Sequence, residues 1–415
     1  MTEPTPARWK RHATLFIAGQ TVSLLGSSLV QYAVLWYMTL TTKDGAVVAL
    51  TVLFGFLPQA VVSIFGGVWA DRHQRKFLIM GADAAIAVAT LALALLMMRG
   101  MDAHWLIYLV LAVRSAGAGI QTPAVAALVP QLVPASQLLR INGINGAVQS
   151  ALMLVAPPVA AVMYATMPLE RIFLVDVATA VVGIGMLAII PVARILPTAG
   201  RASYGADLRE GVRYVASHVF VRWLLGLFAV IITLAAAPSF LTPLLIARSF
   251  GEEVWKLTAN EMAFAVGMTL GGVAISVWAT RLSRRRLMVG ALLVLGAVTV
   301  AMGVAPTLVL FLACMAVCGM AVPAFTTPAT TIMQEVVEPE RHGRVFGFVG
   351  IVNAVAMPLG MVLFGPLANV MSVQAVMILA GCATLVALAV AFLSPQGRRA
   401  VQANRAVMDP PGRDT

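Results

Sequence analysis

Charged residues are scarce throughout this 415-residue chain. They make up only 11% of it, whereas hydrophobic residues make up 60%. A soluble domain needs a charged surface and ordinarily carries about 25% charged residues, so this composition excludes a protein surrounded mainly by water. Lys and Arg outnumber Asp and Glu by 28 to 17, but they occur in short clusters between long apolar runs. Because that distribution is typical of the loops of membrane proteins, we predict a lipid bilayer, and not nucleic acid, as the partner of this chain.

Residues that bind metals, form disulfides or hold nucleotides are also few. The three cysteines lie inside apolar stretches, and the five histidines lie at loops or helix ends without a shared ligand spacing. The sequence contains no glycine-rich phosphate-binding loop, and no loop between apolar segments exceeds about 26 residues. The N-terminal MTEPTPARWKRH leads into a long apolar segment without a small-residue cleavage site. We therefore predict no cofactor, no metal, no enzymatic activity and no removable signal peptide.

Long apolar segments account for most of the sequence. A helix needs about 20 apolar residues to cross the ~30 Å hydrocarbon core of a bilayer, and twelve segments meet that requirement. They cover approximately 13–39, 46–70, 77–98, 104–128, 139–165, 171–193, 220–247, 256–280, 286–304, 306–333, 344–371 and 374–394. The ninth and tenth are separated only by Ala305, Pro306 and Thr307. The predicted fold class is an all-α polytopic membrane protein.

The basic residues predict how these spans are oriented. Lys and Arg concentrate in the cytoplasmic loops of membrane proteins. With twelve spans, 22 of the 28 basic residues fall on the side of the N-terminus, 5 fall on the opposite side, and Arg114 lies within a span. We therefore expect a multi-pass protein of the cell membrane with both termini in the cytoplasm.

The longest loop divides the spans into two groups of six. We expect an N-terminal six-helix bundle over 1–193, a cytoplasmic linker over 194–219, a C-terminal six-helix bundle over 220–395 and a cytoplasmic tail over 396–415. In the linker, Leu208, Val212 and Val215 share one helical face of segment 204–218. This pattern predicts a short amphipathic helix on the inner membrane surface, with a partly ordered linker as the alternative.

The two halves contain related sequences. Residues 68–76, after the second span, read VWADRHQRK, and residues 277–285, after the eighth, read VWATRLSRR, so five of nine positions are identical at an offset of 209. A second repeat, at an offset of 204, relates spans five and eleven: Arg140, Gly143, Gly146 and Val148 match Arg344, Gly347, Gly350 and Val352. These repeats indicate a parallel duplication, the arrangement expected of two bundles that rock about a central site.

The loop after the second span carries a motif of a known family. Residues 67–76 fit G-x-x-x-D-R-x-G-R-K, a pattern that the major facilitator superfamily has at this position, except that Gln74 replaces a Gly. The chain resembles that superfamily over its whole length, which implies a fold of two six-helix bundles. The resemblance implies a gating role for Gly67, Asp71, Arg72, Arg75 and Lys76. It also implies that Asp71 meets the positive N-terminal end of span eleven, near 343–347; pairing with Arg72 or Arg75 is the alternative.

Other stretches narrow the resemblance to one branch. Segments 19–26, 207–211, 334–339 and 343–346 are similar to those of the multidrug exporters that include macrolide-efflux permeases and the enterobactin exporter. This similarity implies a secondary active transporter that exports drugs or small amphipathic metabolites by alternating access, driven by protons, and we expect a monomer. In span five, most glycines of the antiporter motif are replaced by Ala or larger residues. Siderophore export, lysophospholipid flipping and import by the same fold stay open.

A few ionisable residues lie inside the predicted spans. Arg114 is about ten residues into span four, where a charge costs roughly 2.5–3.5 kcal/mol on insertion scales. It should therefore face a cavity or a carboxylate, and the family pattern implies that it couples proton and substrate movement; an ion pair that locks two helices is the alternative. The candidate partners are Asp83, Asp176 and Glu261. Depth along the helices places Asp83 within reach of Arg114, and we favour structural roles for Asp176 and Glu261.

Substrate candidates are polar residues on the four spans that line the cavity in this family, namely one, four, seven and ten. They are Gln20, Ser23, Ser27, Gln31, Gln121, Ser239, Thr326, Thr327 and Thr330. Hydrogen bonding between helices is the alternative for each of them. Pro157, Pro158 and Pro358, in spans five and eleven, are predicted to act as hinges because proline interrupts the helical hydrogen-bond ladder.

Overall fold

All regular structure in the described part of the chain is helical. The computed structural model describes residues 6–192, 213–278, 283–338, 342–403 and 408. Within these ranges, twelve helical segments are long and apolar enough to cross a membrane. The predicted all-α polytopic fold and its number of spans are therefore confirmed.

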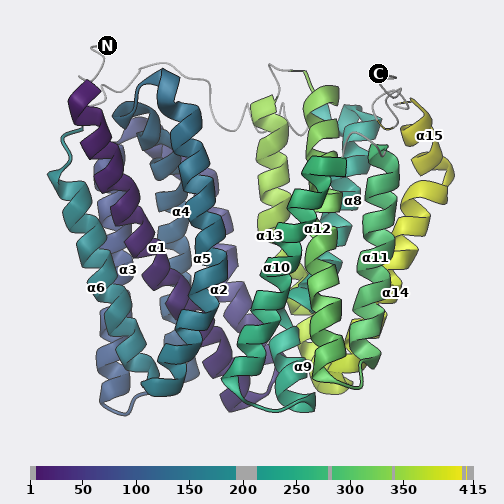
Figure 1. Cartoon of the computed structure of the whole chain (residues 1–415), viewed down its shortest axis with the longest axis horizontal. Helices are drawn as coiled ribbons and strands as arrows, with labels where there is room; N and C mark the ends of the chain where they lie inside the picture. The colour runs from purple at the N-terminus through teal and green to yellow at the C-terminus, as the bar shows by residue number, and fades with distance from the viewer. Residues whose placement is uncertain (1–5, 193–212, 279–282, 339–341, 404–407, 409–415) are drawn as a thin grey trace. The chain divides into compact units, whose positions relative to one another are not determined.

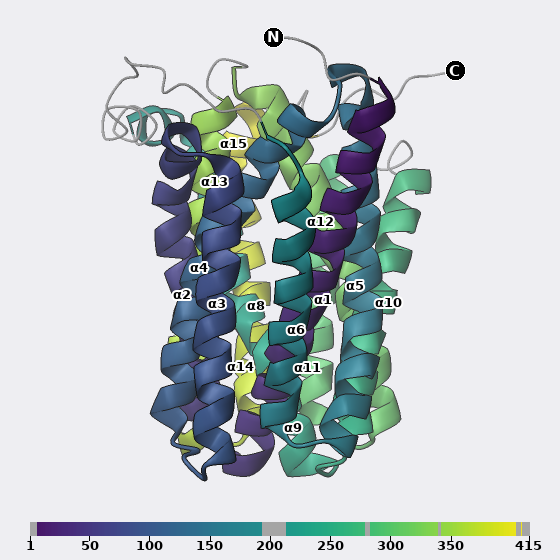
Figure 2. The same cartoon turned by 90° about the vertical axis from the view of Figure 1, so that its left-hand side faces the viewer.

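The first half contains six long helices, joined by short connections (Figure 1). They are α1 (Pro6–Thr42), α2 (Gly45–Arg72), α3 (Arg75–Met98), α4 (His104–Leu132), α5 (Leu138–Thr166) and α6 (Leu169–Ile189), and the short helix η1 (Ala135–Gln137) precedes α5. The turn after α3 depends on Gly100, whose φ is +81°, a conformation that glycine adopts without steric cost. Helices α3, α4 and α6 pack side by side (Figure 2).

The second half contains eight helices in the described ranges. They are α8 (Val219–Phe240), α9 (Thr242–Ser249), α10 (Val254–Trp278), α11 (Arg284–Val304), α12 (Leu308–Val336), α13 (His342–Val370), α14 (Val373–Leu393) and α15 (Pro395–Ala403). The predicted turn at 305–307 is present, and the Thr307 hydroxyl accepts a hydrogen bond from the N–H of Leu310 at 3.4 Å. Because this bond satisfies one free N–H at the start of α12, three residues suffice to separate the ninth and tenth spans.

Three predicted segments differ from the structure or lie beyond it. Span seven was expected as one helix but is divided into α8 and α9 at Leu241, because Pro243, at the start of α9, has no N–H to continue the ladder. The predicted tail contains α15, which composition did not reveal. Residues 204–212 of the predicted amphipathic helix 204–218 lie outside the described residues. Residues 213–217 are described, and they are helical.

The chain forms two compact units. The first comprises 1–41 and 50–200, and the second comprises 42–49 and 201–415. Residues 42–49 are therefore grouped with the second unit, where the N–H of Gly45 donates to Asn369 Oδ1 at 2.8 Å.

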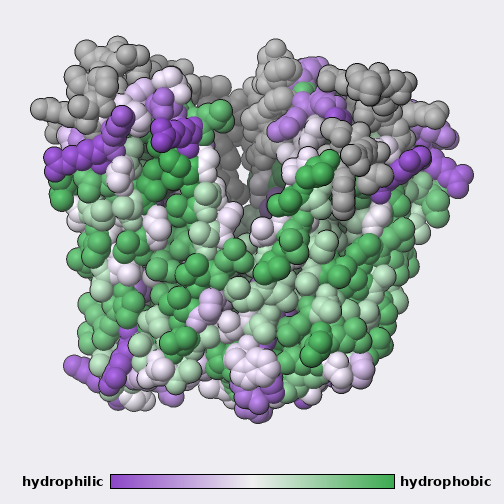
Figure 3. Space-filling model, viewed as in Figure 1, coloured by the Kyte–Doolittle hydropathy of each residue, from purple (hydrophilic) through white to green (hydrophobic). Residues whose placement is uncertain are grey.

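Each unit has an apolar core and an apolar outer surface. The core of the first unit contains Phe16, Ile79 and Leu128, and that of the second contains Phe228 and Phe325, whose rings stack with centroids 5.7 Å apart. Figure 3 shows apolar residues over the middle of the helices in each unit and hydrophilic residues near their ends. Such a surface is suited to a hydrocarbon environment bounded by two polar layers.

Candidate functional site

A buried ion pair lies inside the first unit. Arg114 of α4 and Asp176 of α6 form a salt bridge in which the two side chains are only 11% and 2% exposed. Removing both charges from water costs several kcal/mol per ion, and this cost is offset only when further hydrogen bonds satisfy the pair. The surroundings of the pair therefore decide whether it is stable.

Two hydroxyl side chains provide these further contacts. Arg114 Nη1 donates to Thr90 Oγ1 of α3 at 2.7 Å, and the Ser27 hydroxyl of α1 donates to Asp176 Oδ1 at 3.3 Å. One charged network thus joins α1, α3, α4 and α6. Thr90 was missed by sequence reasoning, although it lies seven residues, or two helical turns, after Asp83 and so on the same face of α3.

Asp83 has a different partner from the one expected. Sequence depth placed it within reach of Arg114, but the buried Gln121 amide of α4 donates to Asp83 Oδ1 at 2.7 Å. The carboxylate that pairs with Arg114 is Asp176, because depth along a helix does not fix the face from which a side chain projects. Gln121 and Arg114 are seven residues apart on α4, and each reaches a different carboxylate.

Glu261, the remaining carboxylate candidate, lies in α10 of the second unit. Asn260 Nδ2 lies 3.3 Å from Glu261 Oε1 and 3.2 Å from the hydroxyl of Thr242. The Oδ1 atom of Asn260 is buried and has no hydrogen-bond partner in the described part of the chain. Glu261 thus has a neutral amide neighbour, and the described residues give it no salt bridge.

The gating motif is described only in part. The side chains of Gly67, Asp71 and Arg72 lie outside the described residues, so the predicted contact of Asp71 with span eleven stays a prediction. Arg75 Nη1 donates to the carbonyl of Ala127 at 2.8 Å. Lys76 Nζ donates to the carbonyls of Ala188 and Ile190, both at 2.7 Å, and so caps the C-terminal end of α6. Cations are favourable there because helix C-termini leave carbonyls unsatisfied and carry partial negative charge.

The nine substrate candidates have different environments. Gln20, Ser23 and Gln121 are buried inside the first unit, and Ser27 contacts Asp176. The remaining candidates differ in exposure: Gln31, Thr327 and Thr330 are exposed, while Ser239 and Thr326 are half-buried. The Thr326 hydroxyl donates to the carbonyl of Val322 in its own helix at 3.0 Å. Gln121 and Ser27 therefore make contacts between helices of the first unit, and a role in substrate binding stays a prediction for all nine residues.

The predicted hinge prolines lie inside continuous helices. Pro157 and Pro158 lie in α5, and Pro358 lies in α13 together with Pro366. Each proline removes one hydrogen bond from its helix. Bending at these points stays a prediction.

Comparisons with known proteins extend these observations. The sequence profile of the family described as "Transmembrane secretion effector" matches residues 2–411. Macrolide efflux protein A of Streptococcus pyogenes is 30% identical over 379 residues, which cover 90% of this chain and 93% of that protein. Multidrug efflux pump Tap of Mycobacterium bovis is 26% identical over 338 residues, which cover 77% and 78% of the two chains.

Solved structures share the fold. A transporter of the POT family in complex with 5-aminolevulinic acid superposes with a TM-score of 0.73 at 12% identity, covering 92% of this chain and 96% of that one. The nucleoside transporter NupG superposes with a TM-score of 0.72 at 14% identity, covering 92% and 99%. At such low identity these similarities concern the architecture alone.

Proposed function

This chain belongs to the transmembrane secretion effector family of major facilitator transporters, and from that premise we propose that it is a proton-coupled exporter of small amphipathic molecules. The exporter works by alternating access of one substrate site to the two sides of the membrane. Relatives named as macrolide and multidrug efflux proteins, matched over most of their length, support outward transport of apolar or cationic drugs, with macrolides as the first class to test.

The buried ion pair carries the proposal. A guanidinium and a carboxylate inside an apolar bundle are rare and expensive, and in membrane proteins they mark ion and substrate pathways. Arg114, Asp176, Ser27 and Thr90 connect four helices of one unit. Helices α3 and α4 also hold the Asp83–Gln121 pair, so a change of charge at that pair would act on two helices that the network joins to α1 and α6.

Asp83 is the proposed proton carrier. Its partner, Gln121, is a neutral amide, so Asp83 can bind and release a proton without breaking a salt bridge. Asp176, by contrast, would leave Arg114 without its counter-ion on protonation. The two carboxylates thus have different proposed roles: Asp83 carries the proton, and Asp176 holds Arg114 in place.

Transport in proteoliposomes tests this proposal. With an acidic lumen, wild-type protein should accumulate radiolabelled erythromycin beyond protein-free liposomes, which correct for the weak-base accumulation of the drug, and a protonophore should abolish the difference. We expect Asp83→Asn to lower this gradient-driven uptake at least tenfold while keeping substrate exchange at equal pH. Glu261→Gln, which removes a carboxylate of the second unit, is the matched control and should transport normally. Normal uptake by Asp83→Asn with loss in Glu261→Gln would assign the proton to the second unit instead.

The proposed orientation has its own test. The asymmetry of 22 to 5 basic residues supports cytoplasmic termini for a transporter that acts as a monomer in the cell membrane. In a cysteine-free background, a membrane-impermeant maleimide should label Asp102→Cys in intact cells and should label Arg398→Cys only after the cells are opened. Labelling of both residues from the same side would contradict the orientation.

A further inference from the structure

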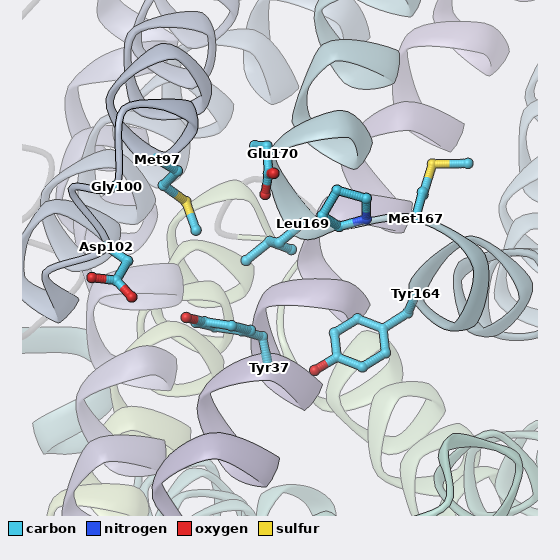
Figure 4. A pocket seen from close by; sticks show the side chains of 9 residues that line it. Tyr37, Met97, Gly100, Asp102, Tyr164, Met167, Leu169 and Glu170 are labelled. Atoms are coloured by element: carbon cyan, nitrogen blue, oxygen red, sulfur yellow. The ribbon is translucent and has the colours of Figure 1, made fainter.

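The first unit contains a cavity that the proposed transport mechanism does not use. It has a volume of about 410 Å³ and lies where α1 and α5 end, beside the connections from α3 to α4 and from α5 to α6 (Figure 4). None of its lining residues belongs to the Arg114 network or to the Asp83–Gln121 pair. The cavity is therefore a separate feature of this unit.

The charge of the cavity is wholly acidic. Among its lining residues Asp102 and Glu170 are acidic and none is Lys or Arg; Figure 4 shows the Glu170 carboxylate directed into the space between the labelled side chains and Asp102 at its edge. In the described ranges neither carboxylate forms a salt bridge. The neighbouring Arg99 and Arg171 do not line the cavity. Two carboxylates at one hollow, neither of them in a salt bridge within the described ranges, favour a positive charge there.

The remaining walls suit an apolar body. Tyr37 of α1 and Tyr164 of α5 place their rings in the cavity, and Figure 4 shows the Tyr37 hydroxyl on the side of Asp102. Aromatic faces attract cations by about 0.5–2 kcal/mol, depending on desolvation. Met97 and Met167 complete the walls with flexible thioether side chains that adapt to different apolar shapes.

We propose that this cavity is a binding site for lipophilic organic cations. Its volume lies in the range of about 300–1,000 Å³ that is usual for small-molecule sites, and it combines carboxylates, aromatic faces and adaptable apolar walls. An ammonium or phosphonium centre lies between Asp102, Glu170 and the tyrosines, while its apolar substituents contact the methionines. The same chemistry is offered by a soluble drug and by the ammonium headgroup of a lipid. The site does not depend on proton coupling.

Equilibrium binding tests the site without transport. Full-length protein in phosphatidylglycerol nanodiscs is titrated with radiolabelled tetraphenylphosphonium at equal pH on both sides, and empty nanodiscs are subtracted. We expect Asp102→Asn combined with Glu170→Gln to weaken binding at least tenfold. Tyr164→Ala should weaken it about threefold to tenfold and Tyr164→Phe less than twofold, because the ring and not the hydroxyl makes the contact. Thermal unfolding without the probe verifies that each variant is folded.

Controls separate this cavity from other sites. Glu253→Gln removes an exposed carboxylate that does not line the cavity and should bind as wild type. Weaker binding of the probe in nanodiscs that contain phosphatidylethanolamine, with no such effect in the double variant, would support the site and identify a lipid ammonium as its occupant. Equal binding by wild type and the double variant would overturn the proposal, as would an equal loss in Glu253→Gln. Because no gradient is applied, failure here leaves the exporter proposal intact, and failure of gradient-driven uptake leaves this one intact.

Discussion

The packing of α3 against α4 and α6 is repeated in that of α11 against α12 and α14, but the two units differ in what they bury at matching places. Gly119 and Pro123 of α4 recur 200 residues later as Gly319 and Pro323 of α12. In both helices, a Cβ on the glycine would approach the backbone of the neighbouring helix, the carbonyl of Gln59 at 2.8 Å in one case and the N–H nitrogen of Met268 at 3.0 Å in the other. In this register Arg114 of the first unit corresponds to Cys314 of the second.

The carboxylates have apolar counterparts as well. Helix α11 begins 209 residues after α3, and α14 begins 204 residues after α6. These offsets match Asp83 with Leu292 and Asp176 with Ala380, and both counterparts are fully buried. A salt bridge that the second unit does make, Arg284 with Glu335, involves side chains 22% and 46% exposed. The second unit therefore folds with apolar side chains at the places of the buried ion pair, although α10 holds another carboxylate, Glu261. This difference supports a role in transport for the charges of the first unit.

The largest loss of stability is expected when the buried Arg114–Asp176 pair is broken. Arg114→Met leaves Asp176 as a buried charge without its cation, and such changes cost about 3–5 kcal/mol. Glu335→Gln, which breaks the exposed pair of the second unit, should cost at most about 1 kcal/mol. Denaturant unfolding of the two variants in mild detergent measures the difference. Equal losses of stability would remove the distinction between the two units.

An intermediate loss of stability is expected where glycines allow two helices to pack in close contact. A Cβ at Gly267 of α10 would overlap the backbone of Ala316 in α12, so Gly267→Ala should destabilise the protein by about 1–3 kcal/mol. The matched control is Gly272→Ala in the same helix, where no atom lies within 4 Å of the added Cβ and where alanine should be neutral or slightly stabilising. Gly119→Ala in the first unit should cost about as much as Gly319→Ala, its counterpart in α12, if the two units pack these helices alike. A much smaller cost there would show that their helix packing differs too.

The smallest loss of stability is expected for Asp44, a charged residue that belongs to the second unit. Asp44 Oδ1 accepts hydrogen bonds from Asn369 Nδ2 at 2.7 Å and from the N–H groups of Ala46 and Val47 at 2.7 and 3.1 Å. The Asn369 bond, followed by the two backbone bonds, lowers the pKa of this carboxyl below its ordinary value of 3.8, and Arg248 lowers it further.

Because the folded-state pKa is lowered, this stabilisation is present above about pH 4 and is lost as the pH falls through the folded-state pKa. Asp44→Asn keeps a helix-capping side chain, so it should reduce the melting temperature by a few degrees at pH 7 and by progressively less as the pH falls below about 4. If the difference in melting temperature between wild type and Asp44→Asn is the same at pH 3 as at pH 7, the effect comes from the geometry of the contact and not from its charge.

Residue patterns predicted the architecture well because the bilayer constrains it strongly. Twelve apolar segments, the short turn at 305–307 and the repeated loop sequences follow from span length and duplication. The division of span seven at Leu241 was not predicted, since many proline-containing spans, α5 among them, remain continuous. The sequence alone therefore did not show that Pro243 would interrupt its span while other prolines would not.

Side-chain partners were less predictable than spans. The sequence indicated that Arg114 faces a cavity or a carboxylate and placed Asp83 within possible reach, whereas the structure pairs it with Asp176. The choice depends on the rotation of α3, α4 and α6 about their axes, which periodicity fixes poorly when all faces are apolar. The cavity between Tyr37, Asp102 and Glu170 had no sequence signal, because its residues come from helix ends far apart in the chain.

The central claim is that the buried charges of the first unit act in transport and are not needed for folding. The direct test is gradient-driven erythromycin uptake by Arg114→Met combined with Asp176→Leu, which replaces both charges by apolar groups and leaves neither one unpaired. Such replacements are often neutral or stabilising, so the free energy of unfolding of this variant should lie within about 1 kcal/mol of the wild-type value. Its erythromycin uptake should nevertheless be no greater than that of protein-free liposomes. Uptake at the wild-type rate by the folded double variant would show that the pair only locks helices together, and would contradict the account.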